Sequence, residues 1–302
     1  QEIRLNSLPG AAVAWVAGMN YYFDNYHLQS YYTSPFFANT NGWRDIRNRT
    51  NSYALFGETT LPLDATQRWS LTTGLRYTHE RRKFDAGYIN NGFAGNAPYY
   101  DQSGKIIDNL LTGRISLAYA LSTDASLFVS IARGAKSGGF PNFTQNASEG
   151  KPDETYKASK SWTYELGSKN RFLDNRMELN ATLFMNNVKD ENLRALDSTS
   201  YRFVPKSIDT RSYGAELEMA LRPLQGLEIM ASLGYTHATL RQVSDDVAAS
   251  SGARDGNRVP SVPRLNAALA AQYRLPGAIL GLPSVQGIVL GAEYQHLGSR
   301  MA

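Results

Sequence analysis

The side chains with the widest chemical repertoire in this chain are its 4 histidines, and their spacing does not point to a shared site. They are His27, His79, His237 and His296. No two have the His-x-x-x-His spacing that brings two imidazoles to one metal ion. The chain has no cysteine, so it offers no thiolate ligand and no disulfide framework. We expect no metal site and no cofactor, and we interpret each histidine as a surface or interface residue.

Two further groupings contain residue types used in catalysis. Asp85 follows His79 closely and could polarise an imidazole, but the sequence shows no third partner and no nucleophile elbow. The segment Lys136-Ser137-Gly138-Gly139 has the residue types of a phosphate loop. It lacks the Gly-x-x-x-x-Gly-Lys-Ser/Thr spacing and a following helix, so a rim loop is the better interpretation. The sequence therefore predicts that the protein is not an enzyme.

Composition narrows the class of partner. Lys and Arg number 31 and Asp and Glu 27, giving a net charge of +4. That balance, without a basic run interleaved with aromatics, predicts no nucleic-acid partner. No run of 18 apolar residues exists that could form a transmembrane helix. The first residues, Gln1 to Leu5, lack the layout of a signal peptide and look like part of a strand, as if the chain belonged to something longer.

The segments expected to form secondary structure alternate apolar and polar residues with a period of two. Between Trp162 and Met185, apolar residues alternate with polar ones in two arms separated by Leu173-Asp174-Asn175-Arg176. Side chains of a strand point to opposite faces alternately, and Asn and Asp tolerate left-handed turn conformations. The stretch is therefore predicted to be a β-hairpin with one apolar and one charged face. Taken alone, it could equally be a hairpin of a soluble sandwich.

The pattern recurs to give about twelve strands, many near ten residues and so longer than is usual in soluble sheets. Short connections alternate with long ones throughout, and the long ones are expected near residues 25–51, 81–105, 134–160, 187–210 and 240–262. In an up-and-down barrel, alternate connections lie at the same rim. Short turns at one rim and long loops at the other are typical of outer-membrane barrels.

The residues on the two faces of the strands favour a membrane barrel. The pattern does not forbid a soluble sandwich outright. The charged residues opposite the apolar stripe are Glu58, Arg76, Arg114, Glu165, Lys169, Glu178, Glu216, Glu218, Glu228 and Arg274. Unpaired charges in a dry core would cost several kcal/mol each, so this face must meet water or a polar filling. The aromatics near strand ends resemble interface girdles: Tyr21, Tyr53, Tyr77, Tyr119, Tyr213, Tyr235, Tyr273 and Tyr294. The predicted fold is an all-β, antiparallel up-and-down transmembrane β-barrel.

Several segments resemble those of one family. The segment Ile131-Ala132-Arg133-Gly134-Ala135-Lys136-Ser137-Gly138-Gly139-Phe140 is similar to the Ser-Arg-Gly-Phe-Lys-Ser-Gly-Gly-Phe segment of TonB-dependent outer-membrane receptors. The other similar pieces, in order, are Ser52 to Glu58, Gly74 to Thr78, Tyr164 to Gly167, Leu173 to Arg176, Tyr213 to Glu218, and Val259-Pro260 with Pro263-Arg264. The resemblance implies a barrel of about 22 strands with a plugged lumen. Residues 1–302 would be a middle-to-late part of its barrel region. The plug, the TonB box and the terminal aromatic strand have no counterpart here.

The resemblance also implies a function. Receptors of this family lie in the bacterial outer membrane, in contact with its lipid, and bind scarce extracellular solutes such as ferric siderophores. Import uses energy relayed by a TonB-type energy-transducing protein, which would act through the missing plug region. The alternatives are a passive outer-membrane pore or structural barrel, and a soluble carbohydrate-binding β protein.

Residue-level expectations follow from the alternation and the loops. One face is expected to meet lipid through Trp162, Leu166, Leu179, Leu183, Leu217 and Leu233, and the other to line the lumen with Glu165, Glu178, Glu216 and Glu218. Loop aromatics with adaptable polar neighbours suit ligand recognition. Candidate ligand contacts are Phe36, Phe37, Trp43, Tyr88, Phe93, Tyr99, Tyr100, Phe140 and Phe143, which could instead pack the loops together. For part of a larger barrel, we expect a curved antiparallel sheet with an open seam, or strained closure between the first and last strands.

Overall fold

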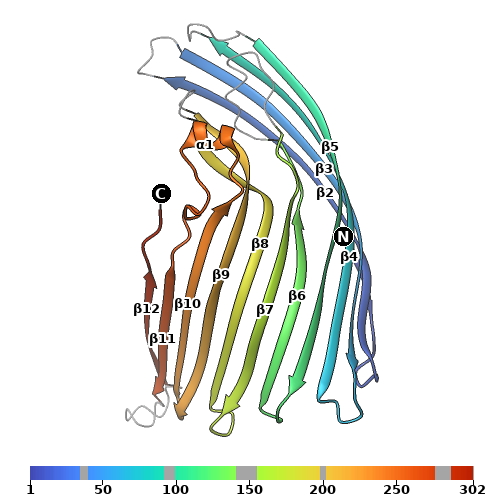
Figure 1. Ribbon diagram of the computed structural model, residues 1–302, viewed down its shortest axis with the longest axis vertical. Coiled ribbons are helices and arrows are strands. Elements are labelled where there is room, and N and C mark those ends of the chain that lie inside the picture. Colours follow the sequence, from blue (N-terminus) through green and yellow to red (C-terminus); the bar gives the residue numbers. More distant parts are fainter. Residues whose placement is uncertain (35–39, 92–98, 141–154, 198–201, 276–286, 302) are drawn as a thin grey trace.

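A computed structural model of the chain shows one antiparallel sheet of 12 strands in sequence order (Figure 1). The structure describes residues 1–34, 40–91, 99–140, 155–197, 202–275 and 287–301. The strands are β1 (Glu2–Asn6), β2 (Ala14–Ser34), β3 (Thr40–Pro62), β4 (Trp69–Asn91), β5 (Tyr99–Ala120), β6 (Ala125–Lys136), β7 (Ser159–Phe172), β8 (Met177–Asp197), β9 (Arg202–Leu224), β10 (Leu227–Arg241), β11 (Leu265–Leu275) and β12 (Ile288–Leu297), and the helix is α1 (Asp245–Ser251).

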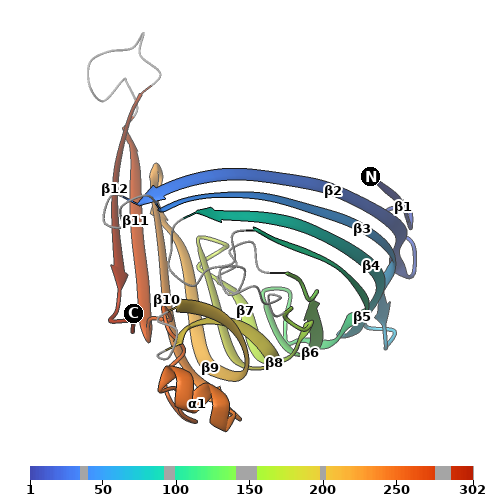
Figure 2. The same cartoon turned by 90° about the horizontal axis from the view of Figure 1, so that it is seen from above.

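The sheet curves into an open trough. Each strand pairs with its neighbours in sequence, and β1 and β12 form the two edges. Seen from above, these edges lie apart (Figure 2), and within the described residues no ladder joins them. The all-β, up-and-down fold and the open seam are both confirmed.

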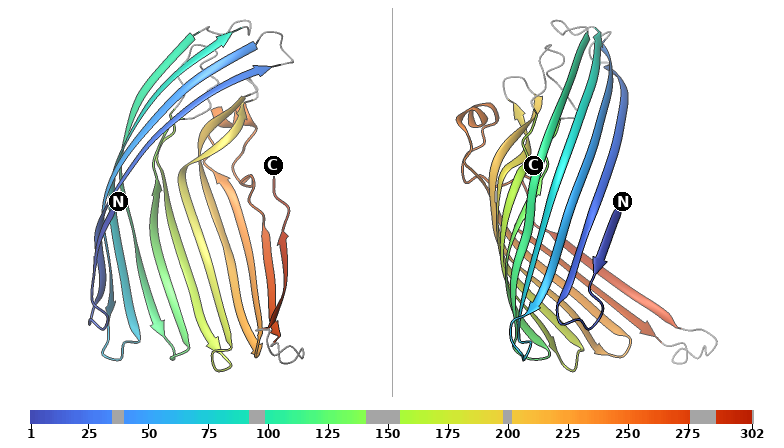
Figure 3. Two further views of the ribbon diagram at one scale, coloured as in Figure 1. Left: turned by 180° about the vertical axis from the view of Figure 1, so that it is seen from behind. Right: turned by 90° about the vertical axis from the view of Figure 1, so that its right-hand side faces the viewer.

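The predicted long connections are wrong over much of their length, because the strands continue into them. The four strands β2 to β5 are 21 to 23 residues long. Thus β2 and β3 stay paired until Ser34 meets Thr40, and β4 and β5 until Ile89 meets Tyr99. The parts of β2 to β5 within the predicted connections, residues 25–34, 40–51, 81–91 and 99–105, are called the extensions. The alternation of apolar and polar residues ends before them, because polar residues such as Asn25 and Arg49 occupy their outer face. The backbone pairing nevertheless continues. The extensions bend over the concave side of the trough (Figures 1 and 3).

The connection expected at residues 240–262 contains the short helix α1, which the sequence analysis did not predict. Asp245 and Asp246 stand in its first turn, where negative charge suits the helix dipole. A hydrogen bond from Ser244 is the main reason that the pKa of Asp246 lies below its usual value. Val247 packs against Ile208 and Leu240, which fastens the helix to the ends of β9 and β10. No helix among the described residues has the length and apolarity needed to cross a membrane.

The short turn predicted for the hairpin between Trp162 and Met185 is confirmed, since β7 ends at Phe172 and β8 begins at Met177. Leu173, Asp174 and Asn175 adopt left-handed backbone with φ of 55°, 53° and 64°. Asp and Asn adopt this conformation readily, whereas Leu does so at a cost. The turn fixes the register in which Leu166 meets Leu183.

That register carries one apolar face without interruption across the sheet. One row runs Met19, Leu55, Tyr77 and Leu111 through β2 to β5, and another runs Val129, Leu166, Leu183, Ala215 and Tyr235 through β6 to β10. The six residues expected to meet lipid all fall on this face, and Glu165, Glu178, Glu216 and Glu218 fall on the other. The Leu183 residue is 58% exposed although it is apolar. An exposed apolar face of this extent requires a covering.

Candidate functional site

On the concave side of the trough, an ion pair joins two strands that are not direct neighbours. Arg114 on β5 donates two hydrogen bonds of 2.8 Å to the carboxylate of Glu58 on β3. The pair passes over Gly74 of the intervening β4, where a Cβ atom would come within 3.0 Å of Glu58 Oε2. Two parallel N–H···O bonds are the strong form of a guanidinium–carboxylate pair. Both side chains remain partly exposed, at 53% and 37%, so this face is polar and open to water.

Aromatic rings cover glycines on the same face. Phe56 lies over Gly18, Phe128 over Gly167 and Phe184 over Gly214, each pair directly opposite in the ladder. A Cβ at Gly167 would come within 2.5 Å of the Phe128 ring, so only glycine leaves room for it. Such rings shield the backbone of a glycine in a strand and fill its missing side-chain volume. This repeated pairing was not predicted.

The segment Lys136 to Phe140 leaves β6 and folds onto the concave side. Gly139 forms an isolated antiparallel bridge with Tyr156, with backbone hydrogen bonds of 3.0 and 2.9 Å. The Gly138 N–H donates to the Asp108 carboxylate at 3.0 Å. A Cβ at Gly138 would come within 2.6 Å of the Tyr156 carbonyl oxygen, and the Tyr156 ring covers Gly139. The glycines of this segment therefore serve close backbone packing rather than phosphate binding.

Phe140 closes an apolar cluster beneath the β2–β5 extensions. Its ring stacks on Phe84 with centroids 4.7 Å apart and planes 6° from parallel, and it is 4% exposed. It lies over Gly104, where a Cβ would come within 2.6 Å of the ring. Ile46 and Ala86 complete the buried set. The cluster fixes the extensions against the segment that follows β6.

The structure brings few of the predicted ligand contacts into a described site. Trp43 is half-buried on β3, between Tyr31 and Ile89 in the ladder. Tyr88 and Tyr100 are ladder partners and Tyr99 meets Ile89, but their side chains lie outside the described set. Phe36, Phe37, Phe93 and Phe143 also lie outside the described residues. Burial of Phe140 supports the alternative role of loop packing for that residue.

The histidines do not converge. His27 contacts the Asp45 carboxylate at 2.8 Å, His79 contacts Asn109 at 2.9 Å, and His237 lies against the Tyr213 ring. His79 has no contact with Asp85 among the described residues. Over the same residues, no three His, Asp or Glu side chains gather as metal ligands.

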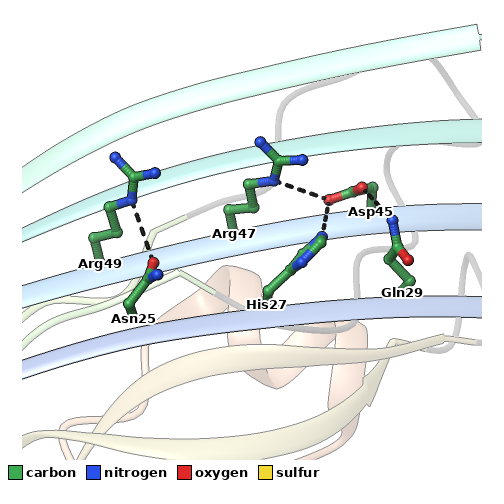
Figure 4. Close-up of polar contacts among 6 residues, drawn as sticks. All are labelled: Asn25, His27, Gln29, Asp45, Arg47 and Arg49. Carbon is green, nitrogen blue, oxygen red and sulfur yellow. Dashed lines mark hydrogen bonds and ion pairs between the residues drawn. The ribbon is translucent and has the colours of Figure 1, made fainter.

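A polar cluster on the outer face of the β2–β3 extension is drawn in Figure 4. Asp45 accepts hydrogen bonds from Gln29 at 2.9 Å and contacts His27, while Arg47 lies 3.5 Å away. The bond from Gln29 is the largest cause of a lowered Asp45 pKa, with His27 and Arg47 contributing and burial opposing it. The cluster joins the two strands where their outer face is no longer apolar.

A curved sheet with an uninterrupted apolar outer face, a charged inner face and short turns at one rim defines the class of transmembrane β-barrel walls. The family described as "TonB dependent receptor-like, beta-barrel" matches residues 2–302, and the chain therefore belongs to that family.

Similar proteins include two curated receptors. The chain is 27% identical over 273 residues to the pesticin receptor of Yersinia enterocolitica, covering 88% of this chain and 37% of that protein. It is 24% identical over 277 residues to the catecholate siderophore receptor Fiu of Escherichia coli K12, covering 87% and 33%. The chain thus spans about a third of the length of these relatives.

Among solved structures, the ferric yersiniabactin uptake receptor FyuA of Yersinia pestis superposes with a TM-score of 0.74 at 22% identity, covering 91% of this chain and 39% of that one. The ferric citrate transporter FecA in its unliganded form gives 0.60 at 19% identity, covering 97% and 41%. At these identities the likeness shows the fold alone.

Proposed function

We propose that residues 1–302 form part of the barrel wall of a receptor of the bacterial outer membrane that imports a scarce solute, such as a ferric siderophore. Import would use energy from a TonB-type energy-transducing protein acting through a plug domain. The observation that carries the proposal is the two-faced sheet, with an apolar face continuous through the ladder and an ion pair spanning three strands on the other. Family membership supports it.

Lipid is the covering that fits the apolar face. On β3, β4 and β5 this face runs from Tyr53 to Leu61, from Trp69 to Tyr77 and from Leu111 to Tyr119. Each span is about nine residues, the length of a tilted strand that crosses the hydrocarbon core. Aromatic residues stand at one end or both ends of each span, as in the girdles of membrane barrels. Beyond Tyr53 and Tyr77, toward the extensions, the outer face of β3 and β4 is polar, with Asn51, Arg49, His79 and Arg81.

The concave side suits the solute path. The Glu58–Arg114 pair and the half-exposed charges beside it remain hydrated, which a filled apolar core would not permit. The β2–β5 extensions, fixed by the Phe140 cluster, bend over this side. We propose that the solute is bound there by aromatic residues from the set Phe36, Phe37, Tyr88, Phe93, Tyr100 and Phe143, with Phe140 positioning them. Trp43 has the same parity on β3 as Asp45 of the outer face, and Tyr99 belongs to the same ladder row as Trp43, so both are left out of this set.

Uptake of radioactive iron tests the proposal. Cells lacking the gene would be compared with cells carrying it, using ferric complexes of catecholate, mixed phenolate and carboxylate siderophores. The expected result is loss of uptake of one complex, and the same loss when the energy-transducing protein is absent. Uptake that persists without the energy-transducing protein would indicate a passive pore. Unchanged uptake of every complex in the deletion strain would reject iron-siderophore import.

A further inference from the structure

The strand β2 carries two tyrosines and an aspartate on one face, Tyr22, Asp24 and Tyr26, which we call the tyrosine stripe. Phe23 and Asn25 alternate with them and lie on the other face. Tyr22 is 54% exposed and Tyr26 is 40% exposed, and Asp24 between them is half-buried. The strand therefore presents two open rings with a carboxylate between them.

The tyrosine stripe faces the concave side of the trough. Tyr26 is the ladder partner of Asn48, and Asn48 is the partner of Phe84, which is buried under Phe140. Residues directly opposite in a ladder point to the same face of the sheet. Asn25 lies on the opposite face, among the outer contacts drawn in Figure 4. The stripe thus belongs to the side on which we propose that the solute is bound.

The polar groups of the stripe are not used within the described part of the chain. There, neither phenol forms a hydrogen bond and Asp24 forms neither a hydrogen bond nor an ion pair. The side-chain oxygen of Asn48, opposite Tyr26, is buried and also has no partner. Buried polar groups normally have one. A carboxylate and an amide oxygen only accept hydrogen bonds, so these groups require a donor from outside the described residues.

The charges around the stripe favour a cationic donor. Over the three ladder rows that contain it, the concave face carries three acids and one base: Asp24, Glu80, Asp108 and Arg82. Arg82 lies 2.9 Å from Glu80, and Asp108 accepts from the Gly138 N–H. Asp24 is left without a cation.

The bases beyond these rows have other neighbours. On this side, Arg44 lies opposite Ser30, Arg76 over the Phe56 ring, Lys136 3.9 Å from Glu191, and Lys157 beside Gly138. None of the four is a ladder neighbour of Asp24. An anion at the stripe would be repelled by Asp24, whereas a cation would be attracted.

We propose that the tyrosine stripe binds a protonated amine of the imported solute, and so selects an amine-bearing ferric complex over an anionic one. The inference rests on the proposed function, which supplies the solute. Asp24 accepts hydrogen bonds from the ammonium group. Tyr22 and Tyr26 lie roughly 7 Å along the strand on either side of Asp24, and the faces of their rings attract the cation.

Binding would be measured for the receptor as its gene encodes it, purified in neutral detergent. The first probe is ferrioxamine B, a ferric trihydroxamate complex that ends in a free protonated amine. The matched probe is the same complex with the amine acetylated, which removes the positive charge and keeps the chelate. A ferric tricatecholate complex, which is strongly anionic, is the third probe.

The unaltered protein should bind ferrioxamine B about tenfold more tightly than its acetylated form, and the tricatecholate complex most weakly. Asp24→Asn should weaken binding of ferrioxamine B about tenfold and leave the acetylated complex unchanged, because it removes a hydrogen bond to a charged group. Tyr22→Ala and Tyr26→Ala should each weaken it about threefold to tenfold. Asp24→Glu should retain most of the binding. Phe23→Ala removes an equally exposed ring, at 54%, from the opposite face and should bind like the unaltered protein.

Three results would overturn the inference. They are the absence of ferrioxamine B binding, tighter binding of the tricatecholate complex, and an equal loss for both hydroxamate complexes in Asp24→Asn, which would indicate a structural role for the carboxylate. If another ferric complex is bound and imported with the energy-transducing protein, the proposed function stands and only this inference fails. If no ferric complex is bound or imported, the proposed function itself fails.

Discussion

Leu183→Arg should destabilise the barrel strongly, whereas Thr182→Arg on the same strand should not. Leu183 lies on the apolar face between Leu166 and Ala215, and Thr182 lies on the polar face between Gly167 and Glu216. The two positions are adjacent, so they share strand, depth and secondary structure. They differ only in the face to which the side chain points.

The size of the destabilisation expected for Leu183→Arg follows from the depth of this residue in the apolar band. Leu183 is six residues above Met177 at the short-turn end of β8, or roughly 14–15 Å at 3.3 Å per residue and a tilt near 45°. The apolar band of such barrels is about 25 Å tall, so this position lies near its middle. An arginine there costs about 2–4 kcal/mol, compared with about 0–1 kcal/mol near an interface. Arginine at position 182 gains a nearby carboxylate, Glu216, and should change stability by less than about 1 kcal/mol.

Equilibrium unfolding by guanidinium in lipid vesicles measures both variants against the unaltered protein. Leu183→Ala is the control for lost apolar contact without added charge, and it should cost less than the arginine variant. Equal destabilisation by the two arginine variants would refute the two-faced assignment. A harmless Leu183→Arg together with a ruinous Thr182→Arg would invert it.

Three further predictions concern the polar side and the extensions. Gly167→Ala should destabilise the sheet by about 1–3 kcal/mol, because the new Cβ would meet the Phe128 ring; guanidinium unfolding measures it, and an unchanged midpoint would refute the packing. Phe140→Ala should speed amide hydrogen exchange in the β4–β5 extension while exchange in the membrane-spanning part stays slow, and uniform exchange rates would contradict the local role. Because the pKa of Asp45 is lowered in the folded state, its stabilisation is present above the ordinary value of 3.8 and is lost as pH falls through the lowered one, so acid should loosen the β2–β3 extension. Asp45→Asn should remove that pH dependence of hydrogen exchange, and an unchanged acid response would refute the assignment.

The two-faced parts of the strands could be predicted because one face is apolar and the other is polar. In β7 and β8 that alternation defines both arms, and the left-handed turn residues define the join. The extensions of β2 and β3 could not be predicted in the same way, since polar residues such as Asn25 and Arg49 occupy the outer face while the ladder continues. Periodicity reports a difference between faces, not the presence of backbone pairing.

The site was less predictable than the fold, because its contacts depend on register between distant strands. Phe140 was identified as an aromatic of the rim, but its partner Phe84 and the space above Gly104 belong to other strands. The charge at Glu58 and Arg114 was assigned to the polar face, yet their pairing across β4 requires the ladder. The Phe–Gly pairs had a detectable signal, since each aromatic falls on the otherwise polar face of its strand.

Spin labelling along β9 tests the central claim most directly. The chain contains no cysteine, so single cysteines at Ala215, Glu216, Leu217 and Glu218 can each carry one label. With the protein in lipid vesicles, collisions with dissolved oxygen should be frequent at positions 215 and 217, and collisions with a water-soluble nickel chelate frequent at 216 and 218. A period of two with this phase is the predicted result. The opposite phase, or accessibility to the nickel chelate at all four positions, would contradict the account.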